Sequence, residues 1–175
     1  MQLRYEETED RLLLRLSTTD DCEFRFWLTR RFVKRLWPML VQMLEWDKAV
    51  QQQLDPDTRH AVLDFQHEGY SAAADYKTQF QERTPDAPRR MPLGEAPVLL
   101  GKAEGKKQSQ GVQILRLHPL HGTGIDMTVD TKLLHVFMRL LREQVGKTDW
   151  DVNLALYEGA ADAMQPGHVE PQRLN

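Results

Sequence analysis

The period of the apolar residues changes within residues 22–44, which read CEFRFWLTRRFVKRLWPMLVQML. In the first part of this segment apolar and polar side chains alternate, so that Cys22 and Phe24 face one way and Glu23 and Arg25 face the other. Such alternation is typical of a half-buried antiparallel strand. From position 29 the apolar residues recur at helical spacing. The sequence therefore predicts a strand that runs directly into an amphipathic helix.

Thr29 is placed to begin this helix, because its hydroxyl can accept a hydrogen bond from one of the free backbone N–H groups of the first turn. Pro38 lies inside the helical pattern and is expected to kink the helix or to start a new turn there. The residues that make up the apolar stripe recur at spacings typical of one helix face: Phe32, Val33, Leu36, Trp37, Leu40, Val41 and Leu44.

The same pattern returns later in the chain. Leu14-Arg-Leu16 aligns with Leu115-Arg-Leu117 at an offset of 101 residues (115 − 14 = 101). At this offset, and without a gap, Thr29 aligns with Asp130, so both predicted helices begin at a residue that favours helix N-caps. We expect two pseudo-repeated units, each of two or three strands followed by a helix. The alternative is a chance alignment of two ordinary strand–helix segments.

Two such units predict an α+β fold in which an antiparallel sheet carries the helices, each helix packing back on the strands of its own unit. Two assemblies satisfy this pattern. We favour a single six-stranded sheet, because pairing the edges of the two units hides two sheet edges. The other assembly consists of two small sheets related by a pseudo-twofold axis.

We expect one compact domain over residues 1–157. The first unit covers about residues 1–54 and the second about residues 98–150, with a helical insertion and a proline-rich connection at about 55–97 between them. Residues 158–175 have no apolar periodicity and are predicted to form a disordered tail.

Other segments carry more local expectations. A helix that begins at Asp55-Pro56 is expected to bury a stripe that includes Val62 and Phe65. Residues 101–111 are rich in glycine and lysine and are expected to form a long hairpin tip. Apolar side chains alternate over residues 152–156, which predicts an edge strand or a short turn of helix.

Composition excludes several classes of protein. Hydrophobic residues make up 41% of the 175 residues and the net charge is only −3, so the chain can form a core. No apolar run approaches the ~18 residues of a membrane span, and the N-terminal residues lack the pattern of a signal peptide. A single cysteine, Cys22, excludes an internal disulfide framework. We therefore expect a soluble, cytoplasmic protein that does not bind membranes.

No motif for catalysis or cofactor binding stands out. None of the three serines lies in a nucleophile-elbow pattern, and residues 101–111 lack the spacing of a phosphate-binding loop. His118 and His121 have the spacing of two metal ligands, but a metal site needs at least one more. Alternation turns Asp126 away from the core, and Asp130 stands at a helix cap. We expect no catalytic, cofactor-binding or metal-binding residue.

A cluster of cations at the start of the first long helix is the most unusual feature of the chain. Arg30, Arg31, Lys34 and Arg35 lie where positive charge opposes the helix dipole, at about 0.3–1 kcal/mol for each exposed cation. We expect acidic residues of the chain to offset this cost, with Asp20, Asp21 and Glu23 close in sequence. Glu6, Glu7 and Glu9 are expected to lie close in space. The alternative is an anionic partner.

Function is predicted from surface features, because catalytic motifs are missing. Trp27 is expected on the outer face of its strand, where an exposed tryptophan is a typical anchor for a partner. The leading hypothesis is a non-enzymatic protein-interaction or assembly module, which includes self-association as a homodimer. A nucleic-acid-binding protein is the first alternative, disfavoured by a sequence pI of about 6.1. A metal-dependent enzyme built on His118 and His121 is the second. The candidate partner- or anion-binding residues are Trp27, Arg30, Arg31, Lys34 and Arg35.

Overall fold

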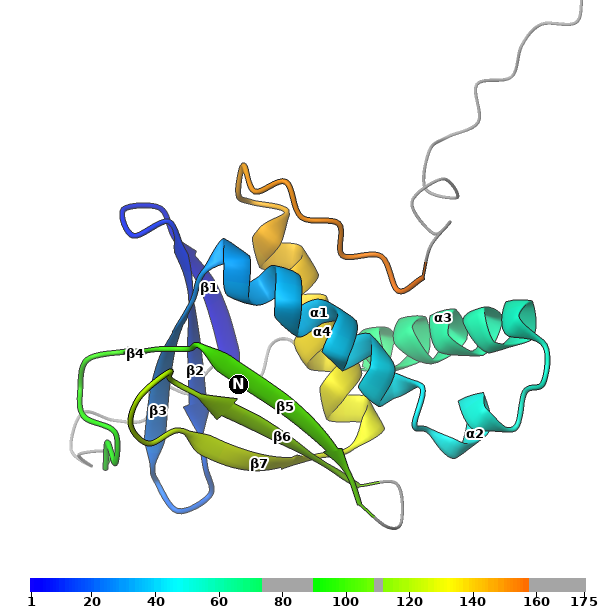
Figure 1. The fold of residues 1–175 in the computed structure, drawn as a ribbon, viewed down its shortest axis with the longest axis horizontal. Helices are drawn as coiled ribbons and strands as arrows, with labels where there is room; N and C mark the ends of the chain where they lie inside the picture. Colours follow the sequence, from blue (N-terminus) through cyan, green and yellow to red (C-terminus); the bar gives the residue numbers. More distant parts are fainter. Residues whose placement is uncertain (74–89, 109–111, 158–175) are drawn as a thin grey trace, which may run out of the picture.

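The computed structural model describes residues 1–73, 90–108 and 112–157, and these form an α+β fold (Figure 1). The predicted tail at 158–175 and residues 74–89 of the helical insertion and proline-rich connection lie outside the described residues. The elements are, in order, β1 (Gln2–Glu6), β2 (Arg11–Ser17), β3 (Glu23–Leu28), α1 (Arg30–Leu44), α2 (Lys48–Gln51), α3 (Pro56–Ala73), β4 (Val98–Leu99), β5 (Lys102–Lys107), β6 (Gln113–His118), β7 (Ile125–Val129) and α4 (Thr131–Val145).

The strands form two sheets, so the single sheet that the sequence analysis favoured is wrong. One sheet has the order β1-β2-β3-β4 and the other the order β5-β6-β7. The edge of β3 that a second unit would have paired with is covered by the chain itself. Val98 and Leu99 pair with it in parallel, and Arg90 forms a further bridge to Cys22. Short parallel pairing after a long connection leaves no sequence period to reveal it.

Both halves of the chain have the same order of elements, three antiparallel strands followed by a helix. Thr29 caps α1 by accepting a hydrogen bond from the Phe32 N–H at 3.2 Å, and Asp130 caps α4 by accepting one from the Leu133 N–H at 2.7 Å. These caps occupy the positions that the 101-residue offset aligns. That the two units are copies of one ancestral unit stays a prediction.

The helix that ends each unit, α1 or α4, lies against the first strand of the other unit. Helix α1 packs on β5 and α4 packs on β1, while α1 and α4 also contact each other (Figure 1). The Tyr5 N–H on β1 donates to the Gln144 side chain of α4 at 3.1 Å. The expectation that each helix folds back on its own strands therefore needs correction. The two units interlock around one core, whose fully buried side chains include Leu14, Phe26, Leu40, Leu115 and Leu141.

The segment expected to be a hairpin tip contains an edge strand. Strand β5 pairs with β6 along its whole length, from Lys102 opposite His118 to Lys107 opposite Gln113. Gly105 is needed here for close packing, because a Cβ at this position would lie 2.7 Å from the Met43 sulfur of α1. Two of the three lysines of β5 belong to the face of the strand that is exposed to solvent, and Gly105 belongs to the face that packs against α1. Composition alone does not distinguish such a strand from a loop.

Helix α3 buries only part of the expected stripe, because Val62 packs against the core but Phe65 does not. Phe65 is 77% exposed, whereas Leu63 and His67 are buried against the rest of the fold. Residues 152–156 form neither strand nor helix, yet Leu154 and Leu156 are buried in the core. Both differences arise because tertiary contacts, and not local period, select the buried side chains of these segments.

None of the helices that can be described is both long enough and apolar enough to span a lipid bilayer.

Two glycines are expected to respond in opposite ways to alanine. Gly124 is the residue before β7 and packs directly against the backbone of β6. A Cβ at this position would overlap the Leu117 carbonyl oxygen and lie 2.6 Å from the His118 Cα. Because the obstacle is backbone, Gly124→Ala should lower the free energy of unfolding by about 1–3 kcal/mol in urea titrations. Gly69 lies within α3 with open space around it, so Gly69→Ala should raise this free energy by about 0.5–1 kcal/mol. Equal effects of the two substitutions would contradict this packing of β6 against β7.

Candidate functional site

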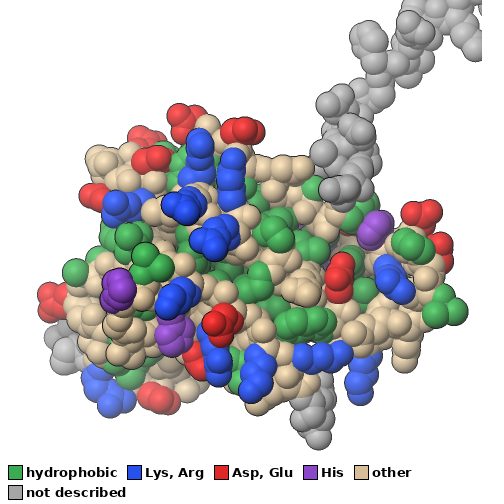
Figure 2. Space-filling view, viewed as in Figure 1, with side chains coloured by type: hydrophobic (Ala, Val, Ile, Leu, Met, Phe, Trp, Pro, Cys, Tyr) green, Lys and Arg blue, Asp and Glu red, His purple; other side chains and the backbone are tan. Residues whose placement is uncertain are grey.

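The four cations predicted at the start of α1 are all exposed. We call Arg30, Arg31, Lys34 and Arg35 the basic cluster. Within the described part of the chain, none of these side chains forms a hydrogen bond or an ion pair. Figure 2 shows Lys and Arg side chains gathered over the start of α1.

The expected internal compensation of these charges is wrong. The first turn of α1 contains no acidic residue. Glu23, one of the expected partners, instead binds Arg25 at 2.7 Å and Arg15 at 3.0 Å. These three side chains lie on the same face of the sheet, because Arg15 is opposite Arg25 in the β2–β3 register and Glu23 is two residues before Arg25. The basic cluster therefore forms no ion pair with the residues that the structure describes.

A groove of about 570 Å³ adjoins the basic cluster. Helix α1 forms one wall, to which Arg31 and Arg35 contribute, and residues 99–104 form the other. Two exposed leucines border the groove: Leu99 is 48% exposed and Leu120 is 61% exposed. Cationic and apolar side chains thus converge on one concave surface. We call this surface the α1–β5 groove.

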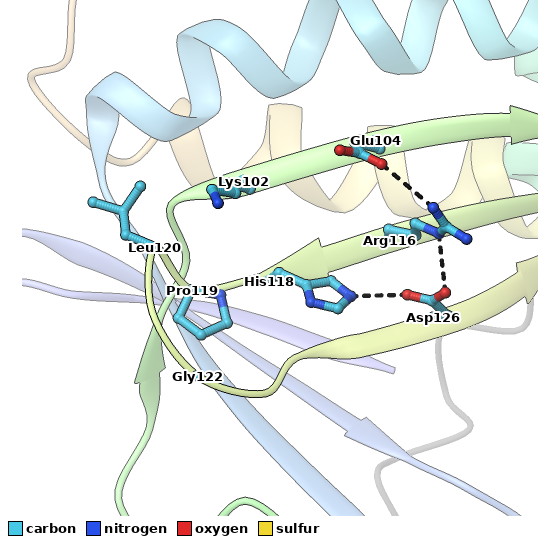
Figure 3. Close-up of a pocket in the computed structure, with 8 residues that line it drawn as sticks. All are labelled: Lys102, Glu104, Arg116, His118, Pro119, Leu120, Gly122 and Asp126. Carbon is cyan, nitrogen blue, oxygen red and sulfur yellow. Dashed lines mark hydrogen bonds and ion pairs between the residues drawn. The ribbon is translucent and has the colours of Figure 1, made fainter.

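A network of charged side chains lies beside the groove on the outer face of the second sheet (Figure 3). Arg116 on β6 binds Asp126 on β7 at 2.9 Å and Glu104 on β5 at 3.5 Å, and His118 binds Asp126 at 2.8 Å. These interactions follow from register, which places Glu104, Arg116 and Asp126 side by side across the three strands. The hydrogen bond from His118, and secondarily the charge of Arg116, lowers the pKa of Asp126.

This network lines a smaller cavity of about 300 Å³ that shares Lys102, Glu104 and Leu120 with the α1–β5 groove. Its cations and anions are already paired with one another, apart from Lys102, for which no ion pair occurs within the described residues. The α1–β5 groove differs in this respect, because its arginines have no acidic partner among those residues.

The two histidines of the metal hypothesis, His118 and His121, have different surroundings. His118 is held by Asp126, while His121 is exposed in the connection between β6 and β7. Asp130 caps α4, as the sequence predicts. Among residues 1–73, 90–108 and 112–157, no three histidine, cysteine, aspartate or glutamate side chains come together in a way that could hold a metal ion. The third ligand that this hypothesis requires is therefore not found in that part of the chain.

Trp27 does not belong to the groove. It lies half-buried on β3, paired across the sheet with Leu13 on one side and Leu99 on the other. Of the residues that the sequence singled out, the structure places Arg31 and Arg35 in the groove wall, with Arg30 and Lys34 beside them on α1. Sequence reasoning missed Leu99 and Leu120. The only signal for them was the presence of leucine within segments otherwise rich in proline and glycine.

A third cavity, of about 710 Å³, lies between α3, α4 and the segment from Thr148 to Tyr157. Several of its polar groups bind one another. Tyr157 donates to Asp64 at 2.6 Å, which raises the pKa of the tyrosine, and Arg142 donates to the Leu154 carbonyl at 3.0 Å. These contacts tie the C-terminal segment to the helices, so we assign the cavity a structural role.

No protein-family model, no curated protein and no solved structure matches this chain, so a function can be argued only from its own geometry.

Proposed function

We propose that this protein is a non-enzymatic protein-interaction module whose α1–β5 groove binds an acidic segment of a partner protein. The observation that carries the proposal is the basic cluster, four exposed cations that form no ion pair within the described chain, beside a groove with two exposed leucines. A partner segment that carries both carboxylates and apolar side chains matches these two features.

The position of the cations supports an anionic partner. Arg30 and Arg31 lie in the first turn of α1, where each opposes the helix dipole at a cost of about 0.3–1 kcal/mol. Carboxylates of a partner that bind near this turn would be attracted by the arginines and by the positive end of the dipole together. The residues that destabilise the free protein would then stabilise the complex.

The groove favours a protein partner over nucleic acid. Surfaces that bind nucleic acid are strongly basic and contact phosphate and sugar. Here the net charge of the chain is −3. Leu99 and Leu120 also line the groove, and phosphates would leave these apolar side chains without an apolar contact. An acidic protein segment can place apolar side chains against the leucines and carboxylates against the arginines.

Selection from a displayed peptide library tests the proposal. We expect the protein to enrich peptides that contain aspartate or glutamate together with leucine-like residues, with binding that weakens as salt is added. The variant Arg31→Glu should enrich none of them. Single- and double-stranded DNA serve as competing probes. Failure to enrich acidic peptides, or tighter binding of DNA than of any peptide, would overturn the proposal.

Neutralising the basic cluster is expected to stabilise the protein while it removes binding. Arg31→Gln should raise the free energy of unfolding by about 0.3–1 kcal/mol, because a cation in the first helical turn is removed. The same change should weaken binding of a selected acidic peptide by about tenfold, since a charge-assisted hydrogen bond contributes about 1.5–3 kcal/mol. Urea titration and fluorescence anisotropy measure the two effects.

Lys132→Gln is the matched control, because Lys132 is exposed at the second position of α4, as Arg31 is in α1. It should give the same gain in stability and leave peptide affinity unchanged. Loss of affinity in both variants, or in neither, would contradict the assignment of binding to α1.

A further inference from the structure

Strand β5 has one edge that does not pair with another strand. It lies at the end of the three-stranded sheet, and among the strands of residues 1–73, 90–108 and 112–157 it pairs with β6 alone. Its other edge faces α1 and the α1–β5 groove, because α1 packs on β5 and residues 99–104 form the groove wall. The backbone of β5 therefore provides part of the wall that a bound segment would touch.

The direction of the backbone groups in β5 follows from its register. The Gln108 N–H donates to the Val112 carbonyl at 3.1 Å, which makes these two residues a hydrogen-bonded pair continuous with the β5–β6 ladder. Such pairs alternate along an antiparallel ladder. The N–H and C=O groups of Lys102, Glu104 and Lys106 then point toward β6, and those of Ala103 and Gly105 point away from it.

One of these outward positions opens on the groove. Gly105 does not line the groove, and Met43 and Trp46 cover the face of the strand to which its Cβ would point, at 2.7 Å and 3.3 Å. Ala103 lies in the groove wall itself. Its backbone N–H and C=O form no hydrogen bond with the loops, helices or side chains that the structure describes. Ala103 thus offers one donor and one acceptor to a ligand.

We propose that the acidic partner segment binds as an extended strand added to the edge of β5 at Ala103. This inference rests on the proposed function and specifies how the partner is held. Edge addition supplies main-chain hydrogen bonds, and alternate side chains of the added strand point to opposite sides. Carboxylates at every second position would face Arg31 and Arg35, and the intervening apolar residues would face Leu99 and Leu120.

The paired part of the added strand is short. The part of β5 that lines the groove runs only from Lys102 to Glu104. About three residues fit between these limits, since a strand rises about 3.3 Å per residue. The partner motif is therefore a short alternation of acidic and apolar residues.

The substitution Ala103→Pro tests this binding mode. Proline removes the outward N–H of Ala103 but none of the bonds of β5 to β6, and an edge strand tolerates proline at such a position. We expect the affinity for a selected acidic peptide to fall at least tenfold. Lys107→Pro is the matched control, because Lys107 also points outward in this register but lies beyond the groove. Its affinity should equal that of the wild type.

Ester substitution in the peptide provides a second measurement that leaves the protein unchanged. Replacing one peptide N–H by an ester oxygen at successive positions should reduce affinity about tenfold at the position that pairs with Ala103 and leave its neighbours unaffected. Unchanged affinity both in Ala103→Pro and throughout the ester series would overturn strand addition while leaving the proposed function intact. Absence of any acidic peptide that depends on Arg31 would instead overturn the proposed function.

Discussion

Lowering the pH from 7.5 to 5 is expected to reduce the free energy of unfolding by about 2 kcal/mol for each of two buried histidines. His67 on α3 and His135 on α4 are 8% and 0% exposed, and their Nδ1 atoms lie 3.1 Å apart at the contact between the two helices. Since one ring nitrogen donates this hydrogen bond and the other accepts it, the pair is complete only when at least one imidazole is neutral.

Burial is the main reason that both rings resist protonation. It lowers the pKa of His67 to about 4, with a further contribution from Arg142, while Asp64 acts in the opposite direction. It also lowers the pKa of His135 to about 4, helped by His67 and opposed by Asp47. The Nε2 of His135 is buried without a hydrogen-bond partner in the described structure, so a second proton there would be unsatisfied.

The direction of the pH effect follows from these pKa values. In the unfolded chain a histidine has its ordinary pKa of 6.5, so protons bind the unfolded state first as the pH falls. Stability is therefore complete above about pH 6.5 and decreases toward pH 4. At pH 5 the loss is about 1.36 kcal/mol for each pH unit below the ordinary pKa of each ring, or about 2 kcal/mol.

Urea titrations at pH 7.5 and pH 5 measure this loss in the wild type and in His67→Leu. The variant should lose about half of the pH dependence, whatever its stability at pH 7.5. His121→Gln removes an exposed histidine and should keep the full dependence. If His67→Leu and the wild type lost equal free energy between the two pH values, the buried pair would not be the cause.

Helices α1 and α4 could be predicted because the sequence signals that specify them are local. In α1 the apolar stripe, the N-cap and the change from strand period all lie within about two dozen consecutive residues. Its predicted stripe is buried except for the partly buried Val41, and Pro38 does not end the helix. In α4 the same features recur with Asp130 as the cap. A period and a cap constrain the backbone directly, whatever the rest of the fold does.

The arrangement of the strands could not be predicted in the same way. Which edge β3 exposes depends on Val98 and Leu99, which are far from it in the sequence. Phe65 and His67 are two residues apart on α3, and only the position of α4 determines that the histidine is the buried one. Contacts between distant segments determine these features, and the apolar period of a single segment contains no information about such contacts.

The candidate site likewise has one part that could be predicted from local sequence and another part that could not. The basic cluster lies within residues 30–35, so its position at the start of one helix was predictable. Its lack of internal partners was not, because that depends on where the acidic residues point. Leu99 and Leu120 reach the groove from two separate connections. A site formed by one local element and two distant ones shows only its local part in the sequence.

Glu23 is the clearest case in which alternation placed a residue on the correct face but not in the correct environment. It lies on the outer face of the sheet, as predicted, yet its side chain is only 1% exposed. Arg15 and Arg25 enclose the carboxylate, and the segment that begins at Arg90 passes beside it, since the Glu23 N–H donates to the Arg90 carbonyl at 2.9 Å. The outer face of β3 is therefore partly covered by the chain that leads into β4.

Replacing Glu23 by alanine is expected to lower the free energy of unfolding by about 3 kcal/mol, the lower end of the range for a broken buried ion pair, because both arginines are 29% exposed. Arg15 and Arg25 lie directly opposite each other in the register, so without the carboxylate two like charges would face each other across the strands. The melting temperature should fall by on the order of 10 °C.

The matched control is Glu104→Ala, which removes a carboxylate that also pairs with an arginine but is 67% exposed. An exposed pair contributes about 0–1 kcal/mol, so this variant should unfold close to the wild type. The double variant Glu23→Ala with Arg15→Met should recover part of the lost stability, because it removes one of the two opposed cations. Equal losses of unfolding free energy in Glu23→Ala and Glu104→Ala would contradict this prediction. Burial of the Glu23 carboxylate between the two arginines would then not stabilise the pairing of β2 with β3, and the segment that covers it would contribute nothing to that pairing.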